Sequence, residues 1–461
     1  MLTYSLENIK EPMYLYLYKC IKNDILSGVL KPKEKLPSKR TFADNNGIST
    51  ITIQNAYDQL ISEGYVYALP KKGYFVADIE GMRVKQVKHD VDLNIKIPEQ
   101  KKYLCDFSSN GIHSDSFPFS VWARMLRDVI SNQKEELLKT SPTSGVRQLR
   151  EAIALHLQSF RGMVVDPNQI VIGAGTEYLY GMITELIGRD KIYAIENPGY
   201  RKLVEIYKSR GILCKFVNID DCGVTSQGLE KSKAQVAHIC PNHHYPTGIT
   251  MNASRRYEIL GWANQEEGRY IIEDDYDSEF RISGKPIPTL FSIDGCEKVI
   301  YMNTFSKSLT PTIRISYMVL PIHLANLFYE KMSMYSCTVS NFEQYALAKF
   351  ISEGYFEKHI NRMRLYYKKK RKSVMDIIKE SKCCEILEND AGLHFVIKID
   401  TKYSDEELKK KLEEKGVKIQ AISDYYLNKQ EEKQHYFIVN YSNLEENCVE
   451  KAIKSIENQV R

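Results

Sequence analysis

Hydrophobic positions in the first part of the chain recur at helical spacing and predict three helices. The first covers residues 12–27 and ends at a Ser-Gly pair. The second covers residues 39–45, with Ser38 as its N-cap, and Ser49 or Thr50 caps the third, which ends at a glycine. This succession of short helices is typical of a helix-turn-helix.

Two short strands complete the N-terminal pattern. Residues 65–67 and 74–76 are rich in aromatic and β-branched side chains and flank a Pro-Lys-Lys-Gly turn, which is typical of a β-hairpin. Three helices followed by a hairpin predict a winged helix-turn-helix domain (α+β) over residues 10–78.

The pattern changes twice beyond this domain. Residues 79–105 are charged, poor in aromatic residues and interrupted by proline, which predicts a linker. From residue 106 to residue 461, short apolar strands alternate with helical stretches, which predicts an α/β domain with a mostly parallel sheet. Its clearest strands are residues 170–172, 191–195, 270–272 and 299–301.

Composition places the chain among cytoplasmic proteins. The 461 residues are 43% hydrophobic and 27% charged, and they contain no run of about twenty apolar residues that would cross a membrane. The N-terminus lacks the basic and then apolar layout of a signal peptide. The ten cysteines are scattered without a Cys-x-x-Cys pair, so we expect reduced thiols and no metal site.

Charge favours a DNA partner only locally. The first eighty residues contain ten Lys and Arg against nine Asp and Glu, but five of the basic residues crowd positions 31–40. In a helix-turn-helix, the N-terminal residues of the second helix of the motif approach base edges, and flanking groups contact phosphates. The alternative is a small helical module that makes protein contacts. The predicted contacts with a double-stranded DNA operator are Ser38, Arg40, Ser49, Thr50, Thr52, Gln54, Lys71 and Lys72.

A second constellation in the larger domain suits pyridoxal 5'-phosphate. Lys307 follows small hydroxyl residues, Arg314 lies seven residues further on, and Asp274 ends an apolar strand. Lys307 would form a Schiff base, Arg314 would clamp the phosphate, and Asp274 would pair with the protonated ring nitrogen. Burial and the neighbouring arginine would lower the pKa of Lys307 toward the neutral amine. Asp275 and Asp277 are the competing candidates for the ring nitrogen.

Further residues extend this predicted cofactor site. Gly175 and Thr176 open a helix directly after a strand, where backbone N–H groups suit a phosphate. Thr304 and Ser306 are candidate hydroxyl donors. Tyr276 would lie on the same side as Asp274 if the strand continues, and it would then meet the ring hydroxyl.

The sequence motifs resemble a known family. The segments Leu36-Pro37-Ser38-Lys39-Arg40 and Ala56-Tyr57-Asp58-Gln59-Leu60-Ile61-Ser62-Glu63-Gly64 resemble the GntR family of bacterial regulators. The later segments resemble fold-type I aminotransferases; they include Glu196-Asn197-Pro198-Gly199-Tyr200, Glu273-Asp274-Asp275-Tyr276 and Phe305-Ser306-Lys307. GntR-like motifs followed by aminotransferase-like motifs, in this order, resemble the MocR/GabR subfamily.

The resemblance implies a homodimer with a fold-type I pyridoxal-phosphate domain, a smaller C-terminal α+β subdomain and a small-molecule effector. It also implies that Tyr200 stacks on the cofactor ring and that Tyr245 stands where aminotransferases carry an asparagine. Three departures are visible. The family often has Arg at position 50, Ser at position 174 and Gln at position 177, where this chain has Thr50, Ala174 and Glu177. A carboxylate at position 177 would repel a phosphate unless it turns away.

The C-terminal region lacks the arginine with which the resembling families grip a substrate carboxylate. Ile438 or a neighbour stands at the expected place, and residues 372–460 contain no arginine. This argues against an ordinary transaminase and against a sensor of an amino acid held by its carboxylate. The candidates for a substitute are Arg124, Arg201, Lys202 and Arg362.

Three interpretations follow. The favoured one is a pyridoxal-phosphate-dependent transcriptional regulator that uses an aminotransferase-like domain as a sensor, with no catalytic residue assigned. Its effector is pyridoxal phosphate itself, with control of vitamin B6 synthesis, or an amino compound that forms an aldimine. The second is an aminotransferase with an appended DNA-binding module. The third is a regulator that has lost the cofactor and keeps the fold for dimerisation.

Overall fold

The chain is described here by a computed structural model. Its contacts divide the chain into two units, Met1–Glu99 and Gln100–Arg461. The predicted linker at residues 79–105 lies mostly outside the described residues. The structure describes residues 4, 11–79, 96–97, 101–109, 111, 116–281, 287–387, 392–427 and 435–460.

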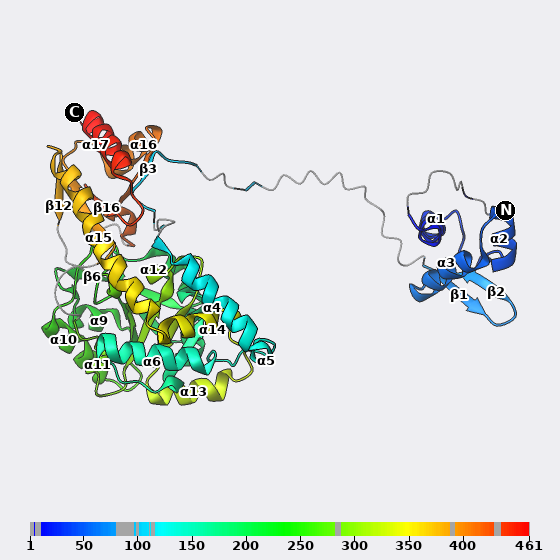
Figure 1. Ribbon diagram of the computed structural model, residues 1–461, viewed down its shortest axis with the longest axis horizontal. Helices are drawn as coiled ribbons and strands as arrows, with labels where there is room; N and C mark the ends of the chain where they lie inside the picture. The colour runs from blue at the N-terminus through cyan, green and yellow to red at the C-terminus, as the bar shows by residue number, and fades with distance from the viewer. Residues whose placement is uncertain are drawn as a thin grey trace. The chain divides into compact units, whose positions relative to one another are not determined.

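The N-terminal unit is a winged helix-turn-helix, as predicted (Figure 1). The two strands pair antiparallel, with Val66 opposite Val76, and form the wing. Leu17, Ile21, Phe42 and Tyr57 are fully buried between the three helices. The elements of this unit are α1 (Met13–Ser27), α2 (Lys39–Asn46), α3 (Thr50–Ser62), β1 (Val66–Leu69) and β2 (Gly73–Val76).

The larger unit is built on an eight-stranded sheet with the order β4-β11-β10-β9-β8-β5-β6-β7. The strands from β10 to β6 run parallel, whereas β11 is antiparallel to both of its neighbours and β7 is antiparallel to β6. The predicted, mostly parallel sheet is therefore confirmed. Its strands are β4 (Ile170–Gly173), β5 (Ile192–Asn197), β6 (Leu213–Asp220), β7 (Gly223–Val224), β8 (Val236–Ile239), β9 (Tyr270–Asp274), β10 (Val299–Thr304) and β11 (Ser316–Val319).

Both faces of this sheet are covered by helices, so alternate residues of a strand pack into different apolar clusters. Ile170 and Ile172 of β4 join one apolar cluster, whereas Val171 between them joins another. A strand buried on both faces reads as a continuous apolar run, which is why these strands were visible in the sequence. The helices are α4 (Phe119–Asn132), α5 (Lys134–Leu137), α6 (Arg147–Arg161), α7 (Thr176–Ile187), α8 (Arg201–Ser209), α9 (Ser226–Ser232), α10 (Ala253–Asn264), α11 (Leu290–Ile293), α12 (Phe305–Ser308), α13 (Ile322–Met332) and α14 (Asn341–Ser352).

The long helix α15 (Tyr355–Lys379) connects this layer to a smaller C-terminal subdomain (Figure 1). There, an antiparallel sheet with the order β12-β13-β16-β15 is joined by two helices, and a parallel β14–β3 pair ties in the start of the unit. These elements are β3 (Cys105–Asp106), β12 (Cys384–Leu387), β13 (His394–Ile399), α16 (Asp405–Glu414), β14 (Val417–Lys418), β15 (Gln420–Ala421), β16 (Tyr436–Asn440) and α17 (Glu446–Val460). Among the described residues, no helix is long and apolar enough to cross a membrane.

Candidate functional site

A cavity of about 280 Å³ lies where the carboxyl ends of the central strands meet the helices that follow them. Strand β9 ends at Asp274, β10 ends at Thr304 directly before α12, and β4 ends two residues before the N-cap of α7. Ligands of open α/β sheets collect at this edge. The cavity lining includes eight of the nine predicted cofactor residues, namely Thr176, Tyr200, Asp274, Tyr276, Thr304, Ser306, Lys307 and Arg314.

Lys307 lies in the short helix α12 and reaches the cavity. Burial lowers the pKa of its ammonium group, and the negative charge of Asp277 opposes that shift. A lowered pKa increases the fraction of neutral amine, which is the nucleophilic form. This pocket therefore favours the chemistry that an amine–aldehyde condensation requires.

Asp274 lines the cavity, and one of its carboxylate oxygens has no hydrogen-bond partner among the described residues. Its Oδ2 accepts a hydrogen bond from the Tyr180 hydroxyl at 2.7 Å and lies 3.5 Å from Nε2 of His238. Its Oδ1 is buried and has no hydrogen-bond partner among the described residues. A buried acceptor without a partner is costly, so this oxygen is suited to receive a donor from a ligand.

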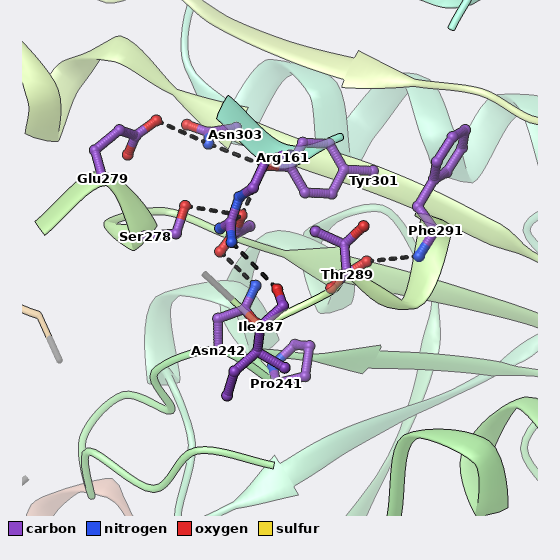
Figure 2. A network of polar contacts seen from close by, with 12 residues as sticks. Arg161, Pro241, Asn242, Ser278, Glu279, Ile287, Thr289, Phe291, Tyr301 and Asn303 are labelled. Carbon is purple, nitrogen blue, oxygen red and sulfur yellow. Dashed lines mark hydrogen bonds and ion pairs between the residues drawn. The ribbon is translucent and has the colours of Figure 1, made fainter. Parts of the chain in front are cut away.

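Asp275 faces away from the cavity into a polar network. Figure 2 shows Arg161, Asn242, Ser278 and Tyr301 gathered there, and all four side chains contact the Asp275 carboxylate. The Tyr301 hydroxyl donates at 2.6 Å and the Asn242 amide at 2.7 Å, while Arg161 forms a buried ion pair. With its acceptor sites used, Asp275 anchors the loop that carries Asp274.

Asp277 is also occupied, by a histidine. Its Oδ2 lies 2.9 Å from Nδ1 of His243, and one donor atom from each of His243, Asp277 and His394 lies within 4.8 Å of the others. Such spacing can suit a metal ion. However, His394 Nε2 lies 3.1 Å from the Pro246 carbonyl oxygen and must carry a proton to bond to it. One nitrogen of each histidine is thus hydrogen-bonded, whereas Nε2 of His243 is buried without a partner among the described residues.

A second part of the cavity suits a phosphate group. Gly175 precedes α7 with φ +91°, and a Cβ atom there would lie 2.3 Å from Nη2 of Arg314. The guanidinium thus packs directly over the N-terminus of α7, where backbone N–H groups attract anions. The hydroxyl of Ser306 is buried without a hydrogen-bond partner in the described part of the chain.

Thr304 plays a more structural part than the sequence indicated. Its hydroxyl accepts hydrogen bonds from the Ser306 backbone N–H at 3.1 Å and from the Ser316 hydroxyl at 2.8 Å. It therefore caps α12 and fixes the turn that carries Lys307.

Three tyrosines line the remaining wall. Tyr200 is 43% exposed, and its ring meets the Tyr245 ring edge to face, with the centroids 6.1 Å apart. Strand β9 ends at Asp274, so Tyr276 does not continue it, yet Tyr276 still borders the cavity and its hydroxyl lies 3.2 Å from Nδ1 of His243. The Tyr245 hydroxyl lies 2.8 Å from that of Tyr425.

The position expected for a carboxylate-binding arginine is apolar. Ile438 is fully buried and packs with Val396, Ile422 and Tyr425. Of the proposed substitutes, only Lys202 is among the lining residues. Arg124 instead lies over the Tyr355 ring at 5.0 Å, and Arg362 donates to the Ser116 carbonyl at 2.7 Å.

Sequence reasoning missed the residues that support Asp274. Tyr180 lies one turn after Thr176 on α7, so helical spacing alone could have placed it on the cavity face. His238 lies in β8, the strand adjacent to β9, and its Nδ1 is held by the Tyr207 hydroxyl at 2.7 Å. His238 and Asp274 lie on different strands, far apart in the sequence, so no local pattern indicates that they meet.

In the N-terminal unit, the predicted DNA contacts lie on exposed or half-buried positions around α2, α3 and the wing. Ser38 and Ser49 use their hydroxyls to cap α2 and α3, by accepting from the backbone N–H groups of Thr41 and Ile51. Most of the other predicted contacts are exposed, and Thr52 is half-buried; these residues are Arg40, Thr50, Thr52, Gln54, Lys71 and Lys72. Ile51, 70% exposed on the first turn of α3, was not predicted.

Comparisons with known proteins agree with both units. Residues 13–76 match the model of the gntR family of bacterial regulatory proteins, and residues 103–456 match the aminotransferase class I and II family. The HTH-type transcriptional regulator YdeL of Bacillus subtilis is 34% identical over 90% of both chains. The pyridoxine biosynthesis regulator PdxR of Corynebacterium glutamicum is 26% identical over 88% of this chain and 87% of its own.

A solved structure shows the same fold for the larger unit. Kynurenine aminotransferase of Pyrococcus horikoshii aligns with a TM-score of 0.69 and 22% identity, over 82% of this chain and 98% of its own. A winged helix-turn-helix domain followed by an aminotransferase-like domain defines a class of pyridoxal-phosphate-dependent transcriptional regulators. Within that class, the chain belongs to the MocR/GabR subfamily of GntR regulators, as the sequence motifs predicted.

Proposed function

We propose that the chain is a homodimeric regulator whose affinity for an operator depends on the occupancy of the Lys307 cavity. One observation carries this proposal. An amine with a lowered pKa, a buried carboxylate oxygen without a partner and an arginine at a helix N-terminus line the same cavity. These are the three groups that a pyridoxal phosphate site needs.

Each group takes one part of the cofactor. When bound, pyridoxal phosphate supplies an aldehyde that reacts with amines and a ring that withdraws electrons. Lys307 supplies the amine, and the free Oδ1 of Asp274 holds the proton at the ring nitrogen. Tyr276 would donate to the ring hydroxyl, and Tyr200 would cover one ring face.

The phosphate end is held by a different set. We assign this role to the backbone N–H groups after Gly175, the hydroxyl groups of Thr176 and Ser306, and the guanidinium of Arg314. The three side chains line the cavity, and Arg314 packs against Gly175. Arginine suits this role because its planar fork of N–H donors matches phosphate oxygens.

The effector that fits this site best is pyridoxal phosphate itself. The apolar cluster around Ile438 offers no cation for an amino-acid carboxylate, and the cations among the described lining residues are Lys202, Lys307 and Arg314. A PdxR relative is named for pyridoxine biosynthesis, which agrees with this choice. An amino compound, or an aminotransferase activity with an appended DNA-binding module, is the alternative.

Two winged domains of a homodimer would contact two operator half-sites. The domains that we propose are residues 10–78 and 106–461, joined by a linker at 79–105. Thr50, Thr52 and Gln54 at the start of α3 would approach base edges, while Ser38, Arg40, Ser49, Lys71 and Lys72 would contact or position the phosphate backbone.

Operator affinity measured with and without pyridoxal phosphate tests this function. The probe is duplex DNA from the chain's own upstream region, and binding is followed by mobility shift and footprinting. We expect the cofactor to change the affinity by about fivefold or more, since allosteric coupling is typically worth 1–3 kcal/mol. Lys307→Ala should remove this response. Unchanged affinity together with an unchanged footprint would defeat the proposal, and steady transamination of an amino-acid panel would favour the enzyme.

A further inference from the structure

The phosphate end of the cavity contains a carboxylate that no phosphate site requires. Glu177 is the second residue of α7, next to Thr176 and beside Arg314. Its Oε1 forms an ion pair with Nζ of Lys202 and lies 3.9 Å from Nη2 of Arg314. One oxygen of Glu177 therefore faces both cations that border this end of the cavity.

Arg314 has a contact at this end of the cavity besides its ion pair with Glu177. Its backbone adopts φ +50°, in the left-handed region, and its guanidinium packs against Gly175, where a Cβ atom would collide with it. A guanidinium held in this way meets any anion at the N-terminus of α7. Glu177 is thus close to an anion site whose arginine also packs against the backbone at Gly175.

With a phosphate bound, Glu177 would leave an excess of negative charge at this end of the cavity. A phosphate monoester carries close to two negative charges at neutral pH. Lys202 and Arg314 together match that charge, and Glu177 adds a third negative charge beside them. The N-terminus of α7 attracts the Glu177 carboxylate for the same reason that it attracts phosphate.

We propose that Glu177 is a built-in competitor for the phosphate-binding cations and that it weakens the binding of pyridoxal phosphate. This inference rests on the proposed function and deepens it. A resident cofactor gains from tight binding, whereas a receptor reports a concentration only when its dissociation constant lies near that concentration. A competing carboxylate at the phosphate end weakens binding, and so makes the site less like that of a tightly held cofactor and more like that of a receptor that reports a concentration.

The effect is expected to be moderate, because the three side chains are about half exposed. The exposed fractions are 43% for Glu177, 53% for Lys202 and 51% for Arg314. Water and salt screen charges at such positions. Removing the carboxylate should therefore tighten binding by about three- to tenfold, well below the effect of a buried charge.

The test compares the dissociation constants of pyridoxal phosphate and of pyridoxal for the full chain and for Glu177→Gln. Both ligands are titrated by visible absorbance at low salt. We expect Glu177→Gln to bind pyridoxal phosphate about three- to tenfold more tightly, with the gain shrinking as salt is added. Pyridoxal lacks the phosphate, so its affinity should not change.

Glu185→Gln is the matched control. Glu185 lies on the same helix, and its carboxylate pairs with Arg189 at i,i+4 instead of facing the cavity. The affinity of this variant for both ligands should equal that of the wild-type protein. It separates the local effect of Glu177 from the general effect of removing a negative charge from α7.

Three outcomes would overturn the inference. Unchanged binding of pyridoxal phosphate by Glu177→Gln would show that the carboxylate does not compete. Weaker binding would show that Glu177 positions Lys202 and Arg314 productively. An equal gain for pyridoxal would place its effect outside the phosphate end. If the unchanged chain bound neither ligand, the proposed function itself would fall, and this inference with it.

Discussion

Lys307→Ala should abolish covalent attachment of pyridoxal phosphate to the chain. Lys307 is the cavity lysine whose pKa is lowered by burial, so it provides the neutral amine that an aldehyde needs. After borohydride reduction, mass spectrometry should find the cofactor on Lys307 in the unchanged chain and no adduct in the variant. The visible absorbance band of the bound cofactor should vanish as well.

Lys202→Met is the control, because Lys202 lines the same cavity but pairs with Glu177. The pKa of Lys202 is raised, mainly by that carboxylate, so its amine stays protonated and unreactive. At saturating cofactor, the variant should keep the band and the adduct on Lys307. An adduct on Lys202, in the wild-type chain or in Lys307→Ala, would contradict the assignment.

Asp275→Ala should destabilise the larger unit by about 3–5 kcal/mol, since removing one partner of a buried ion pair leaves the other charge uncompensated. Arg161 and Asp275 are 3% and 1% exposed, and Tyr301 and Asn242 would also lose their acceptor. Urea unfolding followed by circular dichroism measures the change, without added cofactor because a bound ligand would stabilise the folded state. Asp275→Asn, which keeps the shape and one acceptor oxygen, should lose less.

Asp274→Ala is the matched neighbour. Asp274 loses only the Tyr180 and His238 contacts, and its free oxygen has no partner to lose. We expect a loss of about 1–2 kcal/mol in stability together with a marked loss of cofactor affinity. If Asp274→Ala lost more stability than Asp275→Ala, the structural role would belong to Asp274 and the assignment would be wrong.

The order of elements could be predicted because each segment carries its own local signal. Ser38 and Ser49 were visible as helix caps, and α2 and α3 begin directly after them. The central strands were recognised by their apolar runs, and Asp274 was predicted at the end of one of them, whereas the end of β10 at Thr304 was not predicted. Strands β9 and β10 continue through Asp274 and Thr304, where the ladder persists while the side chains turn polar. Apolar periodicity stops where the functional residues begin.

The cofactor residues were predicted from their types and spacing, and the cavity gathers eight of the nine. What the sequence could not provide was the choice among three neighbouring acidic residues. That choice depends on partners from distant segments, because Arg161 engages Asp275, His243 engages Asp277 and Tyr180 leaves one oxygen of Asp274 free. Likewise, only the packing of Lys202 against Glu177 reveals where that carboxylate points.

The helix α15 contacts both parts of the larger unit. Near its start, His359 Nε2 donates to the carbonyl of Ser308, the residue after the cofactor lysine, at 2.9 Å. Its 25 residues span about 37 Å, and its far end packs on α17 and β12. One continuous helix therefore connects the turn that carries the cofactor lysine with the C-terminal subdomain.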